Sequence, residues 1–221
     1  MVFFEKSQPA PECLNKEKEK KDGDYKCSEV LDRLKDDFKN KCYICESKEP
    51  ISINVEHFIP HRGNKKLKFD WSNLFWCCSH CNNTKLASYS RILNCTVSSD
   101  LVGQRIKYIF KPFPFEKVVI EALSGTSESI ETQRLLNDIY NGTTKLKQIE
   151  SSNLRNSLLK EIINFQNILI DYFESTDEDN KLYLLTKIKE HLNRGSNFTS
   201  FKRWIIFENE MMYEALREYL D

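Results

Sequence analysis

Cys42-Tyr43-Ile44-Cys45 and Cys78-Ser79-His80-Cys81 are the most informative stretches of this sequence. Each places two cysteines at the Cys-x2-Cys spacing of a structural zinc site, and together they supply the four thiolates that a tetrahedral ion takes. An acid–histidine pair, Glu56-His57, lies between them. The sequence therefore predicts a structural Zn²⁺ ion bound by Cys42, Cys45, Cys78 and Cys81.

The bulk composition describes a folded protein with an ionic surface. The chain has 221 residues, 40% hydrophobic and 30% charged, enough for one sizeable core or for a small domain with an accessory one. Lys and Arg together number 33, as do Asp and Glu, so the total charge does not predict nucleic-acid binding. Such binding has to come from a local basic patch or from a partner protein.

The apolar runs and the cysteines bear on the compartment. No apolar run approaches the roughly twenty residues of a membrane span, and Met1–Lys6 is too short for a signal peptide. We therefore expect a soluble protein of the bacterial cytoplasm that does not engage a membrane. In that compartment, cysteines serve as metal ligands or buried thiols more often than they form disulfides. Cys13, Cys27 and Cys95 are accordingly expected to be buried thiols.

Hydrophobic alternation places the acid–histidine pair at the end of a strand. Apolar and polar residues alternate over residues 51–55, and Pro60 stops further pairing. The apolar stretch Asn73–Cys77 predicts a second strand, and the spacing of apolar residues over 82–93 predicts a helix. We expect a small unit of strand, loop, strand and helix built around the zinc ion.

The loop between the two strands is basic. It contains Arg62, Lys65, Lys66 and Lys68 and no acid over residues 61–69. Beside a candidate active site such a loop could meet a phosphate backbone, whereas taken alone it is ordinary solvated surface. The sequence leaves both interpretations open.

The residues around His57 suit phosphodiester hydrolysis. This reaction needs an activated water and a cation that neutralises charge on the phosphate. His57 is a suitable general base because histidine titrates near neutrality. Glu56 and Asn82 offer the oxygen donors that Mg²⁺ or Mn²⁺ prefers. The sequence thus separates two metals by ligand chemistry, zinc on sulfur and a catalytic ion on oxygen.

With these residues in view, the segment resembles the HNH, or ββα-metal, endonuclease family, in the variant framed by a four-cysteine zinc knuckle. The resemblance implies that His57 is the general base, that Glu56 and Asn82 bind the catalytic metal, and that Asn73 organises the histidine-bearing loop. It also implies hydrolysis to 5′-phosphate and 3′-hydroxyl ends. Two positions depart from the commoner pattern, with Glu in place of Asp at 56 and Asn in place of His at 82.

Scattered stretches outside this segment are similar to one HNH subgroup, among them Pro11-Glu12-Cys13-Leu14, Asp70-Trp71-Ser72-Asn73-Leu74 and Ser196-Asn197-Phe198. The subgroup includes the HNH subunit (PtuB) of the Septu antiphage defence system and relatives that accompany retrons. The resemblance implies a partner, an ABC-type ATPase subunit similar to PtuA. DNA is the expected substrate and tRNA the alternative. A different class of function stays open, a catalytically silent adaptor that is stapled by zinc.

Several single residues have two interpretations. Lys85 can contact phosphate, with Arg62, Lys65 and Lys66, or lie on the surface. His61 can touch phosphate or metal, or simply face solvent. His80 is an alternative zinc ligand or, by our preference, an exposed residue of the knuckle. Cys77 is expected to pack in the interior, because Cys78 provides the correct spacing.

The remaining segments are expected to support this unit. Residues 1–14 read as an extended arm and 16–24 as a solvated loop, followed by a helix that starts at Ser28. Later expectations are a loop and short strand over 101–120 and then helices over 132–140, 153–173, 182–192 and 200–220. We predict an α+β protein with an arm (1–27), a zinc-stapled nuclease unit (28–96) and a mainly helical C-terminal region (97–221). That region packs on the nuclease unit, on a partner, or on both.

Overall fold

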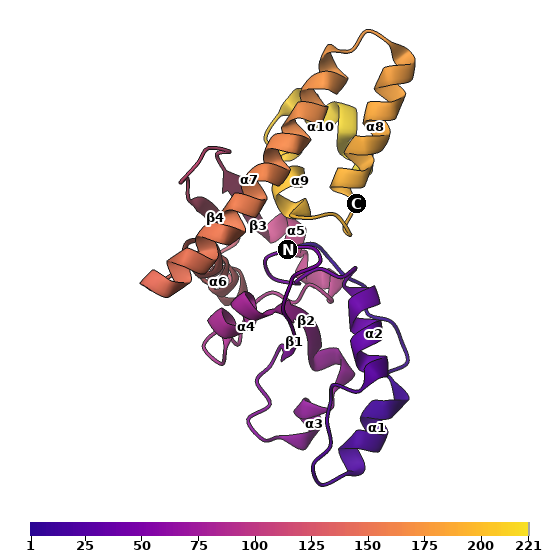
Figure 1. The fold of residues 1–221 in the computed structure, drawn as a ribbon, viewed down its shortest axis with the longest axis vertical. Coiled ribbons are helices and arrows are strands. Elements are labelled where there is room, and N and C mark those ends of the chain that lie inside the picture. Colours follow the sequence, from indigo (N-terminus) through magenta and orange to yellow (C-terminus); the bar gives the residue numbers. More distant parts are fainter. Residues whose placement is uncertain (221) are drawn as a thin grey trace.

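The computed structural model describes residues 1–220 and shows an elongated molecule of helices and two small sheets (Figure 1). The helices are α1 (Glu12–Glu19), α2 (Ser28–Asp37), α3 (Lys65–Lys68), α4 (Ser79–Lys85), α5 (Val102–Arg105), α6 (Ser127–Asn141), α7 (Lys145–Glu174), α8 (Glu178–Leu192), α9 (Thr199–Phe207) and α10 (Glu210–Leu216). The strands are β1 (Ile53–His57), β2 (Leu74–Cys78), β3 (Ile106–Phe110) and β4 (Val118–Ala122). Short 3-10 turns lie at Trp71–Asn73, Ser98–Asp100 and Arg217–Tyr219. The predicted α+β class, with a helical C-terminal part, is confirmed.

β1 and β2 form the antiparallel pair that carries the acid–histidine pair. Glu56 lies opposite Phe75 and His57 opposite Leu74, so both residues stand at the open end of the ladder. Every residue of β2 is buried, which anchors this strand in the core. α4 follows β2 directly, and the predicted order of strand, loop, strand and helix is confirmed.

α4 is shorter than predicted. It ends at Lys85 because Leu86 has a φ of 43°, which a right-handed helix cannot continue. The Leu86 side chain is exposed, and Tyr89 instead donates a hydrogen bond to Asp138 of α6. The prediction of a helix to residue 93 is therefore wrong. The apolar spacing over residues 82–93 is helical, but it does not reveal that the backbone turns away after Lys85.

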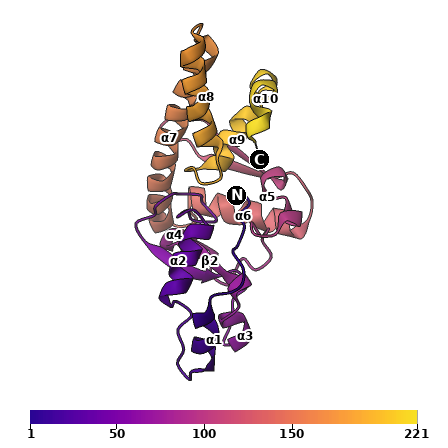
Figure 2. The same cartoon turned by 90° about the vertical axis from the view of Figure 1, so that its right-hand side faces the viewer.

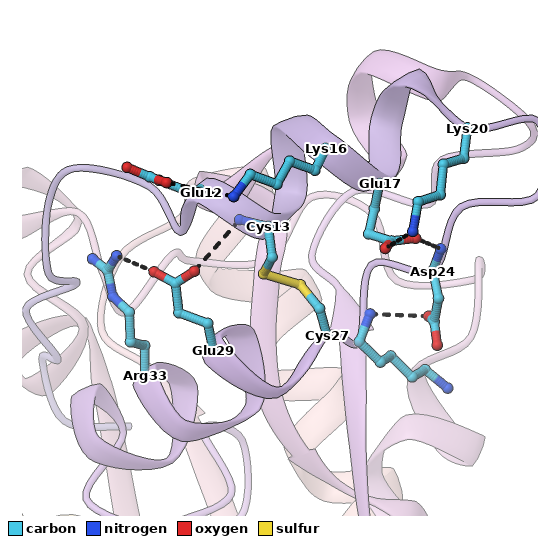
Figure 3. The surroundings of a disulfide bond; sticks show 10 residues. Glu12, Cys13, Lys16, Glu17, Lys20, Asp24, Cys27, Glu29 and Arg33 are labelled. Atoms are coloured by element: carbon cyan, nitrogen blue, oxygen red, sulfur yellow. Dashed lines mark hydrogen bonds and ion pairs between the residues drawn. A yellow bond between two sulfur atoms is a disulfide. The ribbon is translucent and has the colours of Figure 1, made fainter.

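The N-terminal 27 residues also differ from expectation. Residues 12–19 form a helix, α1, in which only Leu14 is buried, so the sequence carries almost no apolar periodicity there. Cys13 of α1 and Cys27, the residue before α2, are joined in a disulfide (Figure 3). The prediction of buried thiols is wrong for these two residues, since composition does not show that the turn after α1 brings them together. Cys95 is a buried, free thiol as predicted.

The C-terminal region consists of a hairpin and helices. β3 and β4 pair antiparallel, where the sequence had suggested a loop and one strand, and α6 packs against β4. α7 extends beyond the predicted helix 153–173 at both ends. The single helix expected over 200–220 is instead two, because Asn209 accepts a hydrogen bond from the Met212 backbone N–H at 3.0 Å and starts α10.

The apolar side chains form two clusters. The larger one extends from the N-terminal segment through β1, β2 and the cysteines to α6, the first part of α7 and Phe201. The smaller one lies at the far end of the molecule, where α7, α8, α9 and α10 meet (Figure 2), and consists of Phe165, Leu169, Ile188, Leu192, Ile206 and Leu216. The domain boundaries at residues 27 and 96 stay a prediction. Within residues 1–220 no helix combines the length and apolar character needed to cross a membrane.

Buried Glu46, next to the first cysteine pair, links that pair to α9. Its carboxylate accepts a hydrogen bond from the Ser200 backbone N–H at 3.0 Å and lies 3.5 Å from the Lys41 ammonium. Burial opposes ionisation of Glu46, but Lys41 and the Ser200 hydrogen bonds prevail and lower its pKa to about 2. The nuclease-like unit and the helical region are thus joined by a charged contact as well as by apolar packing.

Candidate active site

The four predicted zinc ligands converge at the base of β2. The sulfur atoms of Cys42, Cys45, Cys78 and Cys81 all lie within 4.8 Å of one another, and all four residues are buried. The Cys45 and Cys78 sulfurs are 3.8 Å apart, which matches the edge of a tetrahedron with metal–sulfur bonds of about 2.3 Å. This donor set fits a metal ion. Cys77 is buried beside it but is not part of the set, as expected.

His80 does not face solvent from the knuckle as predicted. Its Nδ1 lies 2.8 Å from a carboxylate oxygen of Glu150 on α7, and its Nε2–H donates to the Ile139 carbonyl of α6 at 2.9 Å. His80 therefore fastens the second cysteine pair to the helical region. The expectation failed because both partners come from residues far away in the sequence.

Glu56 and His57 point to opposite faces of β1, because successive strand residues alternate. Glu56 is only 6% exposed and lies towards the knuckle. One carboxylate oxygen accepts a hydrogen bond from the Tyr43 hydroxyl at 2.5 Å, and the other lies 2.6 Å from the Lys85 ammonium. Tyr43 stands between the two cysteines of the first pair, so it connects the metal site to Glu56.

Lys85 is the buried counter-ion of Glu56. It has no exposed surface, and its ammonium also donates to the Phe58 carbonyl at 2.9 Å. Burial raises the pKa of Glu56, and the charge of Lys85 opposes that rise. The prediction that Lys85 contacts phosphate is therefore wrong in this structure, because its ammonium is enclosed by protein.

His57 is held in a defined tautomer. Its Nε2 lies 3.0 Å from the Lys68 carbonyl oxygen, which can only accept, so Nε2 carries the hydrogen and Nδ1 keeps a free lone pair. Two rings flank the half-buried imidazole, Tyr25 with centroids 4.5 Å apart and His61 at 4.6 Å. Burial lowers the pKa of His57 and prevails over the hydrogen bond to the Lys68 carbonyl, which raises it. A neutral imidazole with a free Nδ1 is what a general base requires.

Asn73 fixes the two ends of the loop that follows His57. Its side-chain oxygen accepts from the Ile59 backbone N–H at 2.7 Å, and its amide nitrogen donates to the Ile59 and Leu67 carbonyls at 2.9 and 3.1 Å. All three bonds are made by a side chain that is 4% exposed. These contacts hold the loop at residues 59 and 67, and the part of Asn73 in catalysis stays a prediction.

The basic loop contains one helical turn, α3, capped by the Asn64 side chain. Arg62, Lys65 and Lys66 are exposed on it, as phosphate contacts require. Lys65 also donates from its ammonium to the Lys20 carbonyl at 3.1 Å, which ties this loop to the N-terminal segment. Their contact with phosphate stays a prediction.

Asn82 lies on α4 one turn before Lys85 and is half-buried. Among residues 1–220 its side-chain amide has no hydrogen-bond partner, so its oxygen is available to a metal. Together with the Glu56 carboxylate it offers two oxygen donors, which suit Mg²⁺ or Mn²⁺ with water completing the coordination. The donor types suit such an ion, while both Glu56 oxygens are bonded to Tyr43 and Lys85 in this arrangement.

Sequence reasoning missed Tyr25 and Tyr43 and left His61 as a solvent-facing residue. Tyr25 follows α1 and contacts His57 from a segment that the disulfide closes and that Lys68 contacts at Gly23. Nothing local in the sequence signals this contact. Tyr43, in contrast, lies inside a metal-binding motif, where a buried hydroxyl commonly finds a polar partner.

The comparisons with known proteins agree with this geometry. No curated protein matches the chain. Residues 42–88 match the model of the HNH endonuclease family. This segment begins at the first cysteine of the metal cluster and ends three residues after Lys85, so it contains Glu56, His57, Asn73 and Asn82.

Proposed function

We propose that this protein is a metal-dependent HNH endonuclease that hydrolyses phosphodiester bonds of nucleic acid, with DNA as its substrate. The observation that carries the proposal is the state of His57. Its Nε2–H is committed to the Lys68 carbonyl, and its Nδ1 is left with a lone pair beside an exposed basic loop. A neutral imidazole in this tautomer can take a proton from water through Nδ1.

In the proposed mechanism His57 Nδ1 takes a proton from water. The resulting hydroxide attacks the phosphorus in line with the 3′ oxygen and the P–O3′ bond breaks. The departing 3′ oxygen takes a proton from water, so the products carry a 5′-phosphate and a 3′-hydroxyl. Asn73 keeps the loop, and with it the Lys68 carbonyl, in place for His57. Arg62, Lys65 and Lys66 hold the phosphate backbone. Glu56 and Asn82 would hold Mg²⁺ or Mn²⁺, which would supply positive charge to stabilise the transition state.

The four cysteines are assigned to Zn²⁺ with a structural role. All of their sulfur atoms are buried, and the sulfur spacing suits a tetrahedral ion with no open position for substrate. Soft thiolate ligands select zinc over magnesium, whereas the oxygen donors at Glu56 and Asn82 have the opposite preference. The two metals therefore do not compete for the same site.

We further propose that the protein acts in the bacterial cytoplasm as the nuclease subunit of an antiphage complex with an ABC-type ATPase, like the HNH subunit of Septu systems. The support is the similarity of the scattered stretches outside residues 42–88, together with a net charge of zero. A chain without excess positive charge gains from a partner that binds or recruits nucleic acid.

The second candidate is a catalytically silent adaptor. One observation favours it, the ion pair that Glu56 makes with Lys85, since this pair satisfies the carboxylate without any metal. In that case the zinc knuckle only shapes a surface for the ATPase. Tyr43, Glu56 and Lys85 then form a structural network with no part in chemistry.

A cleavage assay separates the candidates. Purified protein, with and without the ATPase subunit, is incubated with supercoiled plasmid and with total tRNA in Mg²⁺ or Mn²⁺. Wild type should nick the plasmid and His57→Ala should not, while His191→Ala, a histidine on α8 outside the site, should cut like wild type. Cleavage of tRNA alone replaces DNA by RNA as the substrate. Absence of cutting with every combination leaves the adaptor.

A further inference from the structure

The segment between Cys13 and Cys27 lies directly on the histidine-bearing loop. In Figure 1 α1 and α3 are neighbours at one end of the molecule, and the hydrogen bonds agree. Lys65 donates to the Lys20 carbonyl at 3.1 Å, and Lys68 donates to the Gly23 carbonyl at 2.9 Å. The disulfide closes this segment into a loop at its two ends. We call residues 13–27 the N-terminal loop.

Tyr25 is the residue of this loop that reaches the site. Its ring lies edge-on to the His57 imidazole, with centroids 4.5 Å apart and planes at 66°. Within residues 1–220 the Tyr25 hydroxyl has no hydrogen-bond partner, so the contact with His57 is made by the ring and not by the oxygen. Edge-to-face packing is a favoured arrangement of two rings, so the pair stabilises the orientation that both rings have here.

Lys68 contacts both His57 and the segment that carries Tyr25. Its backbone carbonyl accepts the Nε2–H of His57, and its side chain holds the Gly23 carbonyl two residues before Tyr25. The imidazole therefore contacts the Lys68 carbonyl on one side and the Tyr25 ring on another, and Lys68 bonds to the segments that carry both. A base that must deliver Nδ1 to a water molecule depends on such confinement, because a small misplacement of the reacting atom slows the reaction strongly.

The turn of the N-terminal loop packs closely against α1. Glu17 accepts hydrogen bonds from Lys20 and from the Asp24 backbone N–H, which folds the turn back on α1 (Figure 3). At Gly23 a Cβ atom would lie 1.8 Å from the Glu17 carbonyl oxygen. Any larger residue at this position has to push the turn, and Tyr25 with it, away from α1.

We propose that Tyr25, carried by the disulfide-closed N-terminal loop, is a positioning residue of the active site. Its ring holds the His57 imidazole in the orientation in which Nε2 bonds the Lys68 carbonyl and Nδ1 is free for water. The loop lies outside residues 42–88, so this part of the site is supplied from beyond the matched segment. The proposal rests on the proposed nuclease function, and it also makes a claim about ring packing that needs no activity.

Kinetics on plasmid DNA test the positioning. Tyr25→Phe keeps the ring and should leave kcat within about twofold of wild type, whereas Tyr25→Leu should lower kcat at least about tenfold with KM little changed. Gly23→Ala should lower kcat in the same way without altering any side chain of the site. The matched controls are Tyr183→Leu, an exposed tyrosine of α8, and Gly125→Ala, where an added Cβ meets nothing within 4 Å. Both should cut like wild type.

NMR of the His57 ring protons provides a readout independent of cleavage. The nearby Tyr25 ring shifts these resonances, and the shift should persist in Tyr25→Phe and disappear in Tyr25→Leu and Gly23→Ala. If wild type does not cut, the proposed function fails while the NMR comparison still tests the contact. If wild type cuts and Tyr25→Leu has the kcat of wild type, or if its His57 resonances do not move, the positioning proposal is overturned.

Discussion

The ammonium of Lys85 and the carboxylate of Glu56 are 2.6 Å apart, and both are enclosed by the protein. Removing one member of a buried ion pair leaves the other uncompensated, so Lys85→Met should lower the free energy of unfolding by about 3–5 kcal/mol. Urea unfolding measures this loss. Because Glu56 is left to take up a proton, the loss should be smaller at acidic than at alkaline pH.

The double variant Lys85→Met/Glu56→Gln is the control for that experiment. It removes both charges and should recover most of the lost stability. Lys187→Met, which breaks an exposed pair with Glu190 on α8, should change little. Equal losses in the single and double variants would show that the charges themselves are not what matters.

The acidic limb of the pH–rate profile reports on His57. Burial lowers the pKa of this histidine, so its neutral, basic form persists to lower pH than in an exposed histidine. We expect kcat/KM for DNA cleavage to fall off with acid only below the ordinary histidine value of about 6.5. A limb at or above that value would mean that burial does not control the ionisation of the base.

Removal of the structural metal should disturb the acidic residue as well as the knuckle. Tyr43 lies between Cys42 and Cys45 and donates its hydroxyl to Glu56. Chelation of zinc, or the Cys42→Ser variant, should therefore reduce the thermal stability of the protein and abolish cleavage even when Mg²⁺ is in excess. Metal analysis, circular dichroism and the plasmid assay follow these effects. Retention of full stability after zinc loss would exclude a structural ion at the four cysteines.

Asn73 makes three hydrogen bonds that hold the loop after His57. Asn73→Ala leaves the Ile59 N–H and two carbonyls without this partner, which should destabilise the protein by about 1–3 kcal/mol and abolish cleavage. Asn73→Asp keeps the acceptor and loses the donors, so it should fall between wild type and alanine in urea unfolding. A variant with normal stability and normal activity would contradict the loop-organising part assigned to Asn73.

The disulfide should stabilise the protein by restricting the unfolded chain. Its cysteines are 14 residues apart, and a loop of about 15 residues corresponds to roughly 3 kcal/mol in the chain-entropy account. Reduction with a phosphine should lower the urea midpoint by a corresponding amount. The Cys13→Ala/Cys27→Ala variant should start at the lower midpoint and not respond to the reductant.

The sequence predicted those features that depend on short spacings. The cysteine pairs and the apolar stripe within α7 report local geometry, and both match the structure. The alternation over residues 51–55 predicted the strand but not its buried face, since β1 begins at Ile53 and Ile51 is fully exposed. The failures share a different cause. Three residues that the sequence suggests to be on the surface have partners elsewhere in the chain. Lys85 forms a buried ion pair with Glu56 and His80 bonds to Glu150 of α7. Tyr25 packs against His57.

The division of α9 from α10 illustrates the same limit on a smaller scale. The polar run Glu208-Asn209-Glu210 separates the apolar residues of the two helices, but no glycine or proline marks the break. Asn209 caps α10, and a polar run of three residues is equally compatible with the exposed face of one continuous helix. Only the packing of α10 back onto α9 settles the matter.

The separation of the two apolar clusters has an evolutionary consequence. The distal cluster, centred on Phe165 and Ile188, shares no member of its buried core with the cluster that surrounds the cysteines and β1. Substitutions among its six core residues can accumulate and be compensated locally while the contacts of His57 and Glu56 stay as they are. The helices around this cluster can therefore change with little effect on the packing around the cysteines and β1, to which Ile205 is their shared contact.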